Sequence, residues 1–284
     1  MPGATEVAVA GLAYAEGLCW HDGTLWFSDM LRHEVLRYSA STGTQVVATV
    51  RAPSGIGFAP DGTAYVVSRD DDALVRIAPG PAEAVLDLAA LGMVRANDMV
   101  VDTQGRAFLG CLGKEYEQGD EARDWGDTAP GTLACIDLSG SAPISGTIVA
   151  DGLGCPNGMV VDEAAAVLFL AETYGGRVLA YDIDAGGALT GRRVIRAFDT
   201  LVDGMASDGN DLWVAAGPRF ARIDRQGTTR DEIGAPEGTT AITCALGGPS
   251  GRTLFMAVAV VDMEEFVAGR ASSEIRAVEL PPRS

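Results

Sequence analysis

Short apolar runs separated by glycine-containing turns recur along the whole chain of 284 residues. Runs such as 64–69 and 168–173 are dense in β-branched, aromatic and aliphatic residues, and 34–38 alternates apolar with polar residues, so all three are typical of strands. The turns between them carry hairpin chemistry, as in Pro60-Asp61-Gly62 and Ser207-Asp208-Gly209. The pattern therefore predicts an all-β protein of short strands joined by tight turns.

A short motif opens each repeat of this pattern. It reads Asn-Gly-Met-Val-Val-Asp from Asn157 and Asn-Asp-Met-Val-Val-Asp from Asn97. Further copies begin at Glu16, Ser54, Asp203 and, more weakly, near Thr240. We call the first residue of each copy its opening residue. Successive opening residues lie between 37 residues (203 to 240) and 60 residues (97 to 157) apart, and intervals of this length are typical of propeller blades.

Each opening residue is followed by a first strand, a turn and a second strand, and further runs supply third and fourth strands. Second strands are predicted at 25–30, 64–69, 107–112, 168–173, 212–217 and 254–259, and fourth strands at 44–50, 82–88, 144–150 and 192–198. Six such units predict a single domain over residues 1–284, a six-bladed β-propeller of four-stranded antiparallel blades whose first strands line the axis. We expect the run 6–10 to close the ring as the outer strand of the last blade, because an unpaired strand edge is a liability.

The interval between Asn97 and Asn157 is longer than the others, and its excess falls at 113–130. This polar stretch with two aromatic residues predicts a lid-like loop, since loops of this length are commonly functional. The second strand that precedes it returns to the end of the blade where first strands begin, so we expect the lid over the mouth that holds Arg95 and Asn97. Glu115, in its first turn, is the expected substrate contact.

Composition narrows the function classes. A net charge of −18 repels phosphate backbones and anionic membranes, so no nucleic-acid or membrane partner is expected, whereas cations are favoured. Five scattered cysteines indicate neither a disulfide framework nor a zinc knuckle. The chain has two histidines, both in predicted turns, which argues against a Ser-His-Asp catalytic triad. With no leader sequence or apolar run of about 18 residues, we expect a cytoplasmic protein, as a monomer or a weak homo-oligomer.

Three opening residues carry metal-binding oxygen atoms. First strands converge in a propeller, so Glu16, Asn157 and Asp203 are expected to meet although they are far apart in sequence. Two carboxylates brought together repel unless a cation or a proton lies between them. Such ligands suit one divalent ion, Ca²⁺ foremost, with Mg²⁺, Mn²⁺ or Zn²⁺ as alternatives. The competing interpretation is that these side chains only cap strands and turns.

These residues, together with the motif Arg95-Ala96-Asn97-Asp98, resemble the senescence marker protein / gluconolactonase / luciferin-regenerating enzyme family. The resemblance covers essentially the whole chain. It implies that Glu16, Asn157 and Asp203 are the ligands of one divalent metal ion. It also implies that Asn97 faces the metal, as a further ligand, or the substrate, and that Arg95 binds substrate.

The activity implied by the resemblance is metal-dependent hydrolysis of a lactone, a sugar lactone or a similar small cyclic ester, by metal-activated attack of water. Asp203 is the expected catalytic base. Arg95, Asn97, Asp98 and Glu115 are the expected substrate contacts, although turn capping explains Asp98 about as well. Two alternatives stay open: phosphotriester hydrolysis at the same metal site, and a propeller that binds a ligand without catalysis. A metal-free activity like that of strictosidine synthase is disfavoured by the intact Glu, Asn and Asp set.

Overall fold

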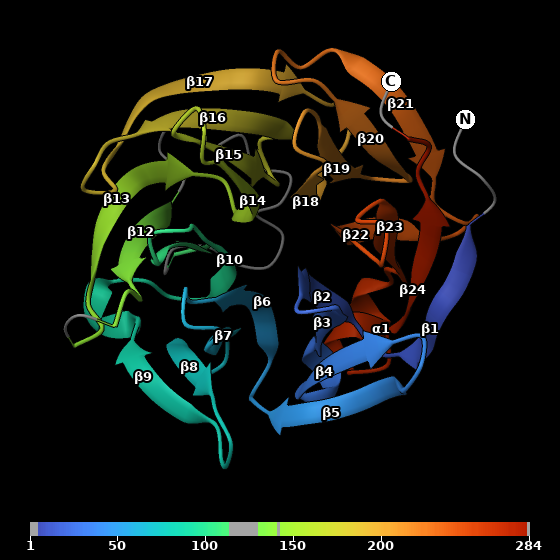
Figure 1. The fold of residues 1–284 in the computed structure, drawn as a ribbon, viewed down its shortest axis with the longest axis horizontal. Helices are drawn as coiled ribbons and strands as arrows, with labels where there is room; N and C mark the ends of the chain where they lie inside the picture. The colour runs from blue at the N-terminus through green and yellow to red at the C-terminus, as the bar shows by residue number, and fades with distance from the viewer. Residues whose placement is uncertain (1–4, 114–129, 141–142, 283–284) are drawn as a thin grey trace. The chain divides into compact units, whose positions relative to one another are not determined.

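Six four-stranded sheets make up the part of the chain that the computed structural model describes, which is residues 5–113, 130–140 and 143–282. Neighbouring strands in a sheet are antiparallel. In five of the sheets the four strands are consecutive in sequence, and in the sixth the N-terminal strand β1 joins three C-terminal strands (Figure 1). This is the architecture of a six-bladed β-propeller, as predicted. The chain divides into two compact units, one of residues up to Pro53 and from Asp203 onward, the other of Ser54–Val202.

The first unit holds three blades. Their strands are β2 (Ala15–His21), β3 (Thr24–Asp29), β4 (Glu34–Ser39) and β5 (Gly43–Thr49); β18 (Val202–Ser207), β19 (Leu212–Ala216), β20 (Arg219–Ile223) and β21 (Thr229–Gly234); and β22 (Thr240–Gly247), β23 (Thr253–Val260), β24 (Ser272–Glu279) and β1 (Glu6–Leu12).

The second unit holds the other three blades. Their strands are β6 (Pro53–Phe58), β7 (Ala64–Ser68), β8 (Ala73–Ile77) and β9 (Glu83–Asp87); β10 (Ala96–Val101), β11 (Arg106–Cys111), β12 (Gly131–Asp137) and β13 (Gly146–Leu153); and β14 (Pro156–Asp162), β15 (Val167–Glu172), β16 (Arg177–Ile183) and β17 (Leu189–Ala197).

Burial explains why second strands have the strongest apolar sequence signal. Every residue of β7, β15 and β19 is buried, whereas β5 and β17 are mostly exposed. A strand covered on both faces needs apolar side chains at successive positions, so its pattern is continuous rather than alternating. The fourth strand of a blade is covered less and carries more polar residues.

The N-terminal strand completes the last blade, as predicted. β1 pairs antiparallel with β24, with Glu6 opposite Ala277, and the sheet order is β1-β24-β23-β22. Helical segments are short: η1 (Met30–Arg32), η2 (Ala89–Leu91) and α1 (Met263–Val267). No helix in the described part of the chain has the length and apolar character needed to cross a membrane.

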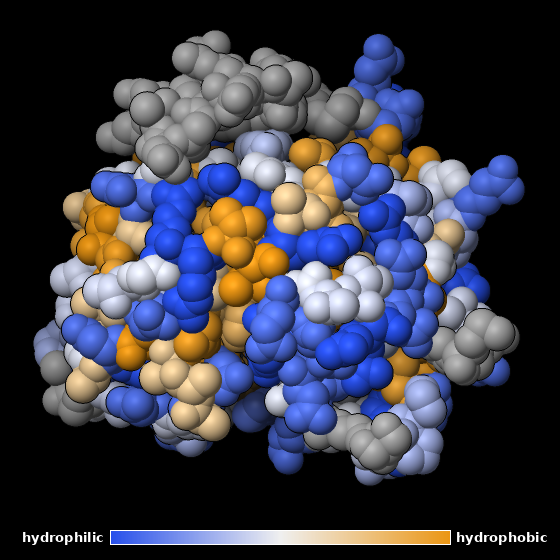
Figure 2. Space-filling model, turned by 90° about the horizontal axis from the view of Figure 1, so that it is seen from above, coloured by the Kyte–Doolittle hydropathy of each residue, from blue (hydrophilic) through white to orange (hydrophobic). Residues whose placement is uncertain are grey.

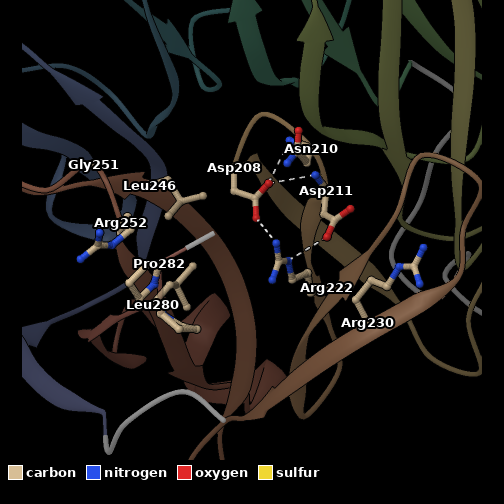
Figure 3. A pocket seen from close by; sticks show the side chains of 11 residues that line it. Asp208, Asn210, Asp211, Arg222, Arg230, Leu246, Gly251, Arg252, Leu280 and Pro282 are labelled. Carbon is tan, nitrogen blue, oxygen red and sulfur yellow. Dashed lines mark hydrogen bonds and ion pairs between the residues drawn. The ribbon is translucent and has the colours of Figure 1, made fainter. Parts of the chain in front are cut away.

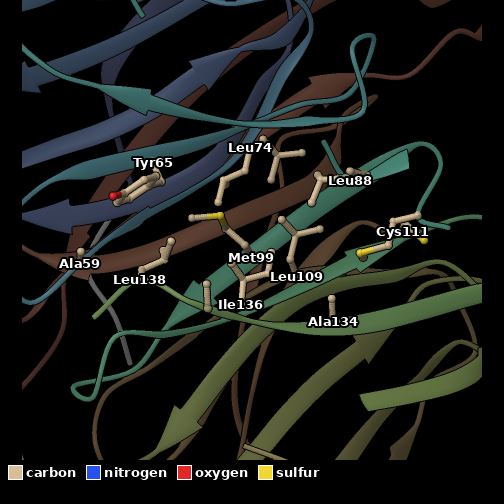
Figure 4. Packing of buried hydrophobic residues seen from close by; sticks show 14 residues of the cluster. Ala59, Tyr65, Leu74, Leu88, Met99, Leu109, Cys111, Ala134, Ile136 and Leu138 are labelled. Atoms are coloured by element: carbon tan, nitrogen blue, oxygen red, sulfur yellow. The ribbon is translucent and has the colours of Figure 1, made fainter. Parts of the chain in front are cut away.

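Apolar side chains fill the space between neighbouring blades. In the second unit, Leu74, Met99 and Leu109 belong to one buried cluster that joins the β6–β9 blade to the β10–β13 blade (Figure 4). Much of the face shown in Figure 2 is hydrophilic, with hydrophobic side chains gathered in small groups between the polar ones. Among the described residues, Val46 and Val194 on the outer strands β5 and β17 are examples of exposed large hydrophobic residues. Within each unit the core therefore lies between its blades.

Candidate active site

The predicted opening residues occupy one structural position, the start of the first strand of a blade. Glu16 lies at the start of β2, Asn97 of β10, Asn157 of β14 and Asp203 of β18. The strand pairing of β2, β10 and β14 is irregular at this position. Irregularities of this kind redirect a side chain out of the regular alternation and are common next to active sites.

Asn97 and Asn157 come together in the second unit. The side-chain Nδ2 of Asn97 donates a hydrogen bond of 3.3 Å to the backbone carbonyl of Pro156, the residue before Asn157. Asn97 is 3% exposed and Asn157 is 7% exposed. Buried amides need hydrogen-bond partners, so this link fixes the two first strands relative to each other at their opening ends.

The structure adds Arg69, which the sequence did not single out. Arg69 directly follows β7, and its Nη1 donates a hydrogen bond of 3.0 Å to Oδ1 of Asn97. Both ends of the Asn97 amide are therefore bound to protein groups. A guanidinium at this distance competes with a metal ion for Oδ1 of Asn97. Its donors are instead suited to bind the oxygen atoms of a substrate beside Asn97.

Thr173 holds Asn157 in a comparable way. Thr173 directly follows β15, and its Oγ1 accepts a hydrogen bond of 3.1 Å from Nδ2 of Asn157. Because the amide nitrogen is fixed on the threonine hydroxyl, the carbonyl oxygen Oδ1 must point to the other side. This orientation leaves Oδ1 as the atom of Asn157 that suits a metal ion.

Arg95 lies at the rim, two residues before Asn97, and is exposed. Its backbone is left-handed (φ 57°), as are those of Ala52 and Cys155, which hold the same position before their own opening residues. The backbone nitrogen of Arg95 donates a 2.6 Å hydrogen bond to Oδ1 of Asp72. The turn that carries Arg95 is thus fixed by a carboxylate of the neighbouring blade.

The predicted lid begins beside Arg95, and its two ends lie next to each other. The backbone nitrogen of Leu112 bonds to the carbonyl of Arg95 (3.2 Å), and that of Gly113 bonds to the carbonyl of Val94 (3.0 Å). Gly113 and Pro130 are in close contact, since a side chain at Gly113 would overlap the Pro130 backbone. The rest of the insertion, including Glu115, lies outside the described residues, so its role stays a prediction.

Asp98 lies between two blades. Its Oδ1 accepts a hydrogen bond of 2.8 Å from the backbone nitrogen of Met99, and a side chain at Gly55 would overlap the same oxygen. Burial raises the pKa of Asp98 to about 6, and the Met99 hydrogen bond opposes this rise only in part. A carboxyl with such a pKa both donates and accepts hydrogen bonds near pH 6.

In the first unit, Glu16 is 7% exposed and Asp203 is half-buried. The residue before Glu16 is fixed, because the Ala15 nitrogen donates a 2.9 Å hydrogen bond to Oγ of Ser273. The residue after Asp203 is fixed as well, since a side chain at Gly204 would overlap Thr243 of β22. The strands that carry both carboxylates are therefore held against the β22–β24 blade.

The donor atoms of the predicted ligand set fit a hard cation. Glu16 and Asp203 supply carboxylates, and Asn157 supplies an amide oxygen whose direction Thr173 fixes. Within the described residues no group of three or more His, Cys, Asp and Glu side chains is placed to share an ion. The predicted ligand set contains only two such side chains, Glu16 and Asp203, and its third member is an amide. Metal binding and the identity of the metal therefore stay predictions.

A cavity of about 430 Å³ in the first unit is lined by none of the predicted site residues. Figure 3 shows Asp208 and Asp211 facing Arg222, which forms ion pairs of 2.6 Å and 3.0 Å with them. Asp208 follows β18 at the end opposite Asp203. The two other arginines that line this cavity, Arg230 and Arg252, form ion pairs with Asp224 and Glu279. Because all three arginines are paired with carboxylates, this cavity does not resemble an anion site.

Comparison with known proteins shows the family of the chain. The family model described as "SMP-30/Gluconolactonase/LRE-like region" matches residues 14–260. The chain belongs to this family. Pentonolactonase XacC of Haloferax volcanii, a relative of this SMP-30/gluconolactonase-like chain, is 28% identical over 276 residues, which cover 90% of this chain and 84% of the relative.

Solved structures share the fold of this SMP-30/gluconolactonase-like chain. A gluconolactonase from Xanthomonas campestris superimposes with a TM-score of 0.75 at 20% identity, covering 98% of this chain and 89% of its own. The calcium-binding protein regucalcin from Agrobacterium tumefaciens superimposes with a TM-score of 0.73 at 20% identity, covering 95% and 92%. Every residue of the predicted site lies inside the stretch that matches the family.

Proposed function

We propose that this chain is a divalent-metal-dependent lactonase that opens a sugar lactone or a similar small cyclic ester. The observation that carries the proposal is the pair of buried amides at the opening ends of the strands, Asn97 bonded to the half-buried Arg69 and Asn157 bonded to Thr173. Relatives named pentonolactonase and gluconolactonase support this substrate class. The calcium-binding regucalcin supports a divalent ion.

Glu16, Asn157 and Asp203 are the proposed ligands, because they share one position in the repeat and carry hard oxygen donors. When bound, the ion would supply a Lewis acid that polarises the lactone carbonyl and stabilises negative charge on its oxygen. Asp203 takes the proton from the attacking water. The assignment of Asn97 as a further ligand is secondary, because Arg69 already engages its oxygen.

The remaining residues bind and orient the lactone. Arg69 and Arg95 offer guanidinium donors to ring and hydroxyl oxygens, and Asn97 is held by Arg69 in a fixed direction. Asp98 offers a carboxyl group to a substrate hydroxyl. Glu115, on the insertion, is a further proposed contact with the lactone.

The test is turnover of gluconolactone and pentonolactones, followed by acid release, before and after treatment with a chelator. We expect chelation to abolish turnover and Ca²⁺ or another divalent ion to restore it. Asp203→Asn at saturating metal should lower kcat by orders of magnitude with the fold intact, because an amide cannot accept the proton. Faster turnover of a phosphotriester than of every lactone would favour the phosphotriesterase alternative, and ligand binding without any turnover would favour a binding protein.

A further inference from the structure

Glu172 is a carboxylate with almost no contact with solvent. It ends β15 and is 1% exposed. Its Oε2 is bound by Nε of Arg177, and its Oε1 lies 3.5 Å from Nη2 of Arg192. A buried charge is retained only where it is paired and hydrogen-bonded, so this carboxylate is enclosed by two arginines.

The same carboxylate binds the turn that leads to Asn157. Oε1 of Glu172 accepts a hydrogen bond of 2.9 Å from the backbone nitrogen of Gly154. The next residues of the chain bind the turn as well: the nitrogen of Thr173 bonds to the Cys155 carbonyl (3.0 Å), and that of Tyr174 bonds to the Gly154 carbonyl (3.0 Å). The residues at and after the end of β15 therefore hold the whole segment 154–157.

This segment requires support because of its backbone. Cys155 is left-handed (φ 59°), a conformation that is unfavourable for a residue other than glycine and persists where its surroundings enforce it. Room for the ion pair comes from Gly175, where a side chain would overlap the carboxylate of Glu172. The turn, the ion pair and the glycine are thus parts of one arrangement.

We propose that Glu172, held by Arg177, is a positioning residue that sets the direction of the Asn157 side chain and of the Pro156 carbonyl. The inference rests on the proposed function, in which Asn157 is a metal ligand. The Pro156 carbonyl also receives the Asn97 amide, so the same turn supports the substrate side of the site. Substitution of a residue that holds a metal ligand in place commonly lowers metal affinity by about 10- to 100-fold.

The first test is a double-mutant cycle in the full chain, with Ca²⁺ binding measured by calorimetry. Glu172→Gln keeps the shape of the side chain but removes the charge that Arg177 binds, so we expect Ca²⁺ affinity to fall about 10- to 100-fold. In an Asn157→Ala background the same change should cause no further loss. The matched control is Asp182→Asn, which breaks the exposed ion pair with Arg193 in the same blade and should leave affinity unchanged. Equal losses in both backgrounds would overturn the proposal.

The second test needs no metal. Hydrogen–deuterium exchange of metal-free Glu172→Gln should be faster at the amides of Gly154, Thr173 and Tyr174 than in the parent protein, with the other blades unchanged. Unchanged exchange in this segment would also overturn the proposal. If the parent chain bound no Ca²⁺, the metal assignment would fail, and exchange would still decide the positioning role. Should Glu172→Gln not fold, Arg177→Lys is the milder variant, and the same local change is expected.

Discussion

At the scale of single residues, Arg69 is the side chain whose removal should weaken substrate binding most directly. Its guanidinium fixes the Asn97 amide and places a positive charge beside the buried oxygen Oδ1 of that residue. Hydrogen bonds to charged groups contribute about 1.5–3 kcal/mol. We therefore expect Arg69→Met to lower kcat/KM for a sugar lactone by roughly 10- to 150-fold, chiefly through KM, as measured by steady-state kinetics.

The matched control for Arg69 is Arg76→Met in the same blade, because the side chain of Arg76 on β8 forms an exposed ion pair with Glu83 on the outer strand β9. It should leave kcat/KM unchanged. Arg69→Lys keeps the charge but not the planar donors, so it should recover only part of the loss. A wild-type KM in Arg69→Met would remove Arg69 from the site.

The contrast between Asn97 and Arg69 shows what single residues reveal in a sequence. Asn97 and Asn157 open a repeated motif, so their equivalence is visible in the sequence alone. Arg69 and Thr173 directly follow second strands, where the residue type changes from blade to blade. Only the pairing of the first and second strands, such as Pro156 opposite Glu172, places the residue after the second strand beside the opening residue of the blade.

At the scale of elements, contacts between blades depend on glycines that leave room for a neighbour. A side chain at Gly247 of β22 would overlap the indole of Trp20 of β2, and that ring stacks on Phe255 with centroids 5.5 Å apart. Overpacking costs about 1–3 kcal/mol, so Gly247→Ala should lower the free energy of unfolding by that amount in urea titrations.

Two further variants separate this overlap from an effect of glycine itself. Gly234→Ala of β21 adds a methyl group where no atom lies within 4 Å, so it should not destabilise the protein. Trp20→Ala should make the cost of Gly247→Ala disappear, because the overlapping ring is gone. An unchanged cost without the indole would contradict this account.

The turn between β20 and β21 should respond to acid. Oδ1 of Asp224 accepts backbone hydrogen bonds from Thr228 (2.8 Å) and Gln226 (2.9 Å), and Arg230 binds its other oxygen. The Thr228 hydrogen bond is the main reason that the pKa of Asp224 lies below its usual 3.8. A carboxyl whose pKa is lower in the folded than in the unfolded protein stabilises the fold at pH values above the unfolded-state pKa. This contribution disappears as the pH falls through the folded-state pKa.

Asp224→Ala should therefore lower the free energy of unfolding most above about pH 4. The difference from the parent protein should shrink as the pH falls below 3.8. Urea unfolding at pH 7, 5 and 3 measures it. A difference that stayed constant over this range would show that the charge of Asp224 does not contribute.

The bounds of the buried second strands were predicted in every blade, whereas those of the exposed outer strands were predicted within one residue for β5 and β9 only. All second strands begin and end within one residue of the predicted bounds, because their continuous apolar runs stop at polar or glycine-containing turns. The outer strands β13 and β17 begin or end two or three residues away from prediction. Their exposed positions carry polar residues, so the periodic pattern there is weak.

At the scale of the whole molecule, the repeat, the strand order and the family agree on a propeller. They do not determine which cation the acidic chain prefers, because carboxylate and amide oxygens accept several divalent ions. Charge contributes separately from any specific site. A net charge of −18 creates repulsion that opposes the folded state and that salt screens.

Thermal unfolding can separate this general repulsion from binding at the proposed ligands. In chelator-treated protein, raising NaCl from about 10 mM to 0.5 M should raise the Tm, because the screening length falls from about 30 Å to less than 8 Å. About 5 mM CaCl₂ should raise it further than NaCl of equal ionic strength, because an ion bound only by the native state adds stability by mass action. Asn157→Ala should keep the NaCl response and lose most of the extra Ca²⁺ response. If Ca²⁺ and matched NaCl gave the same Tm, divalent ions would act on this chain by screening alone.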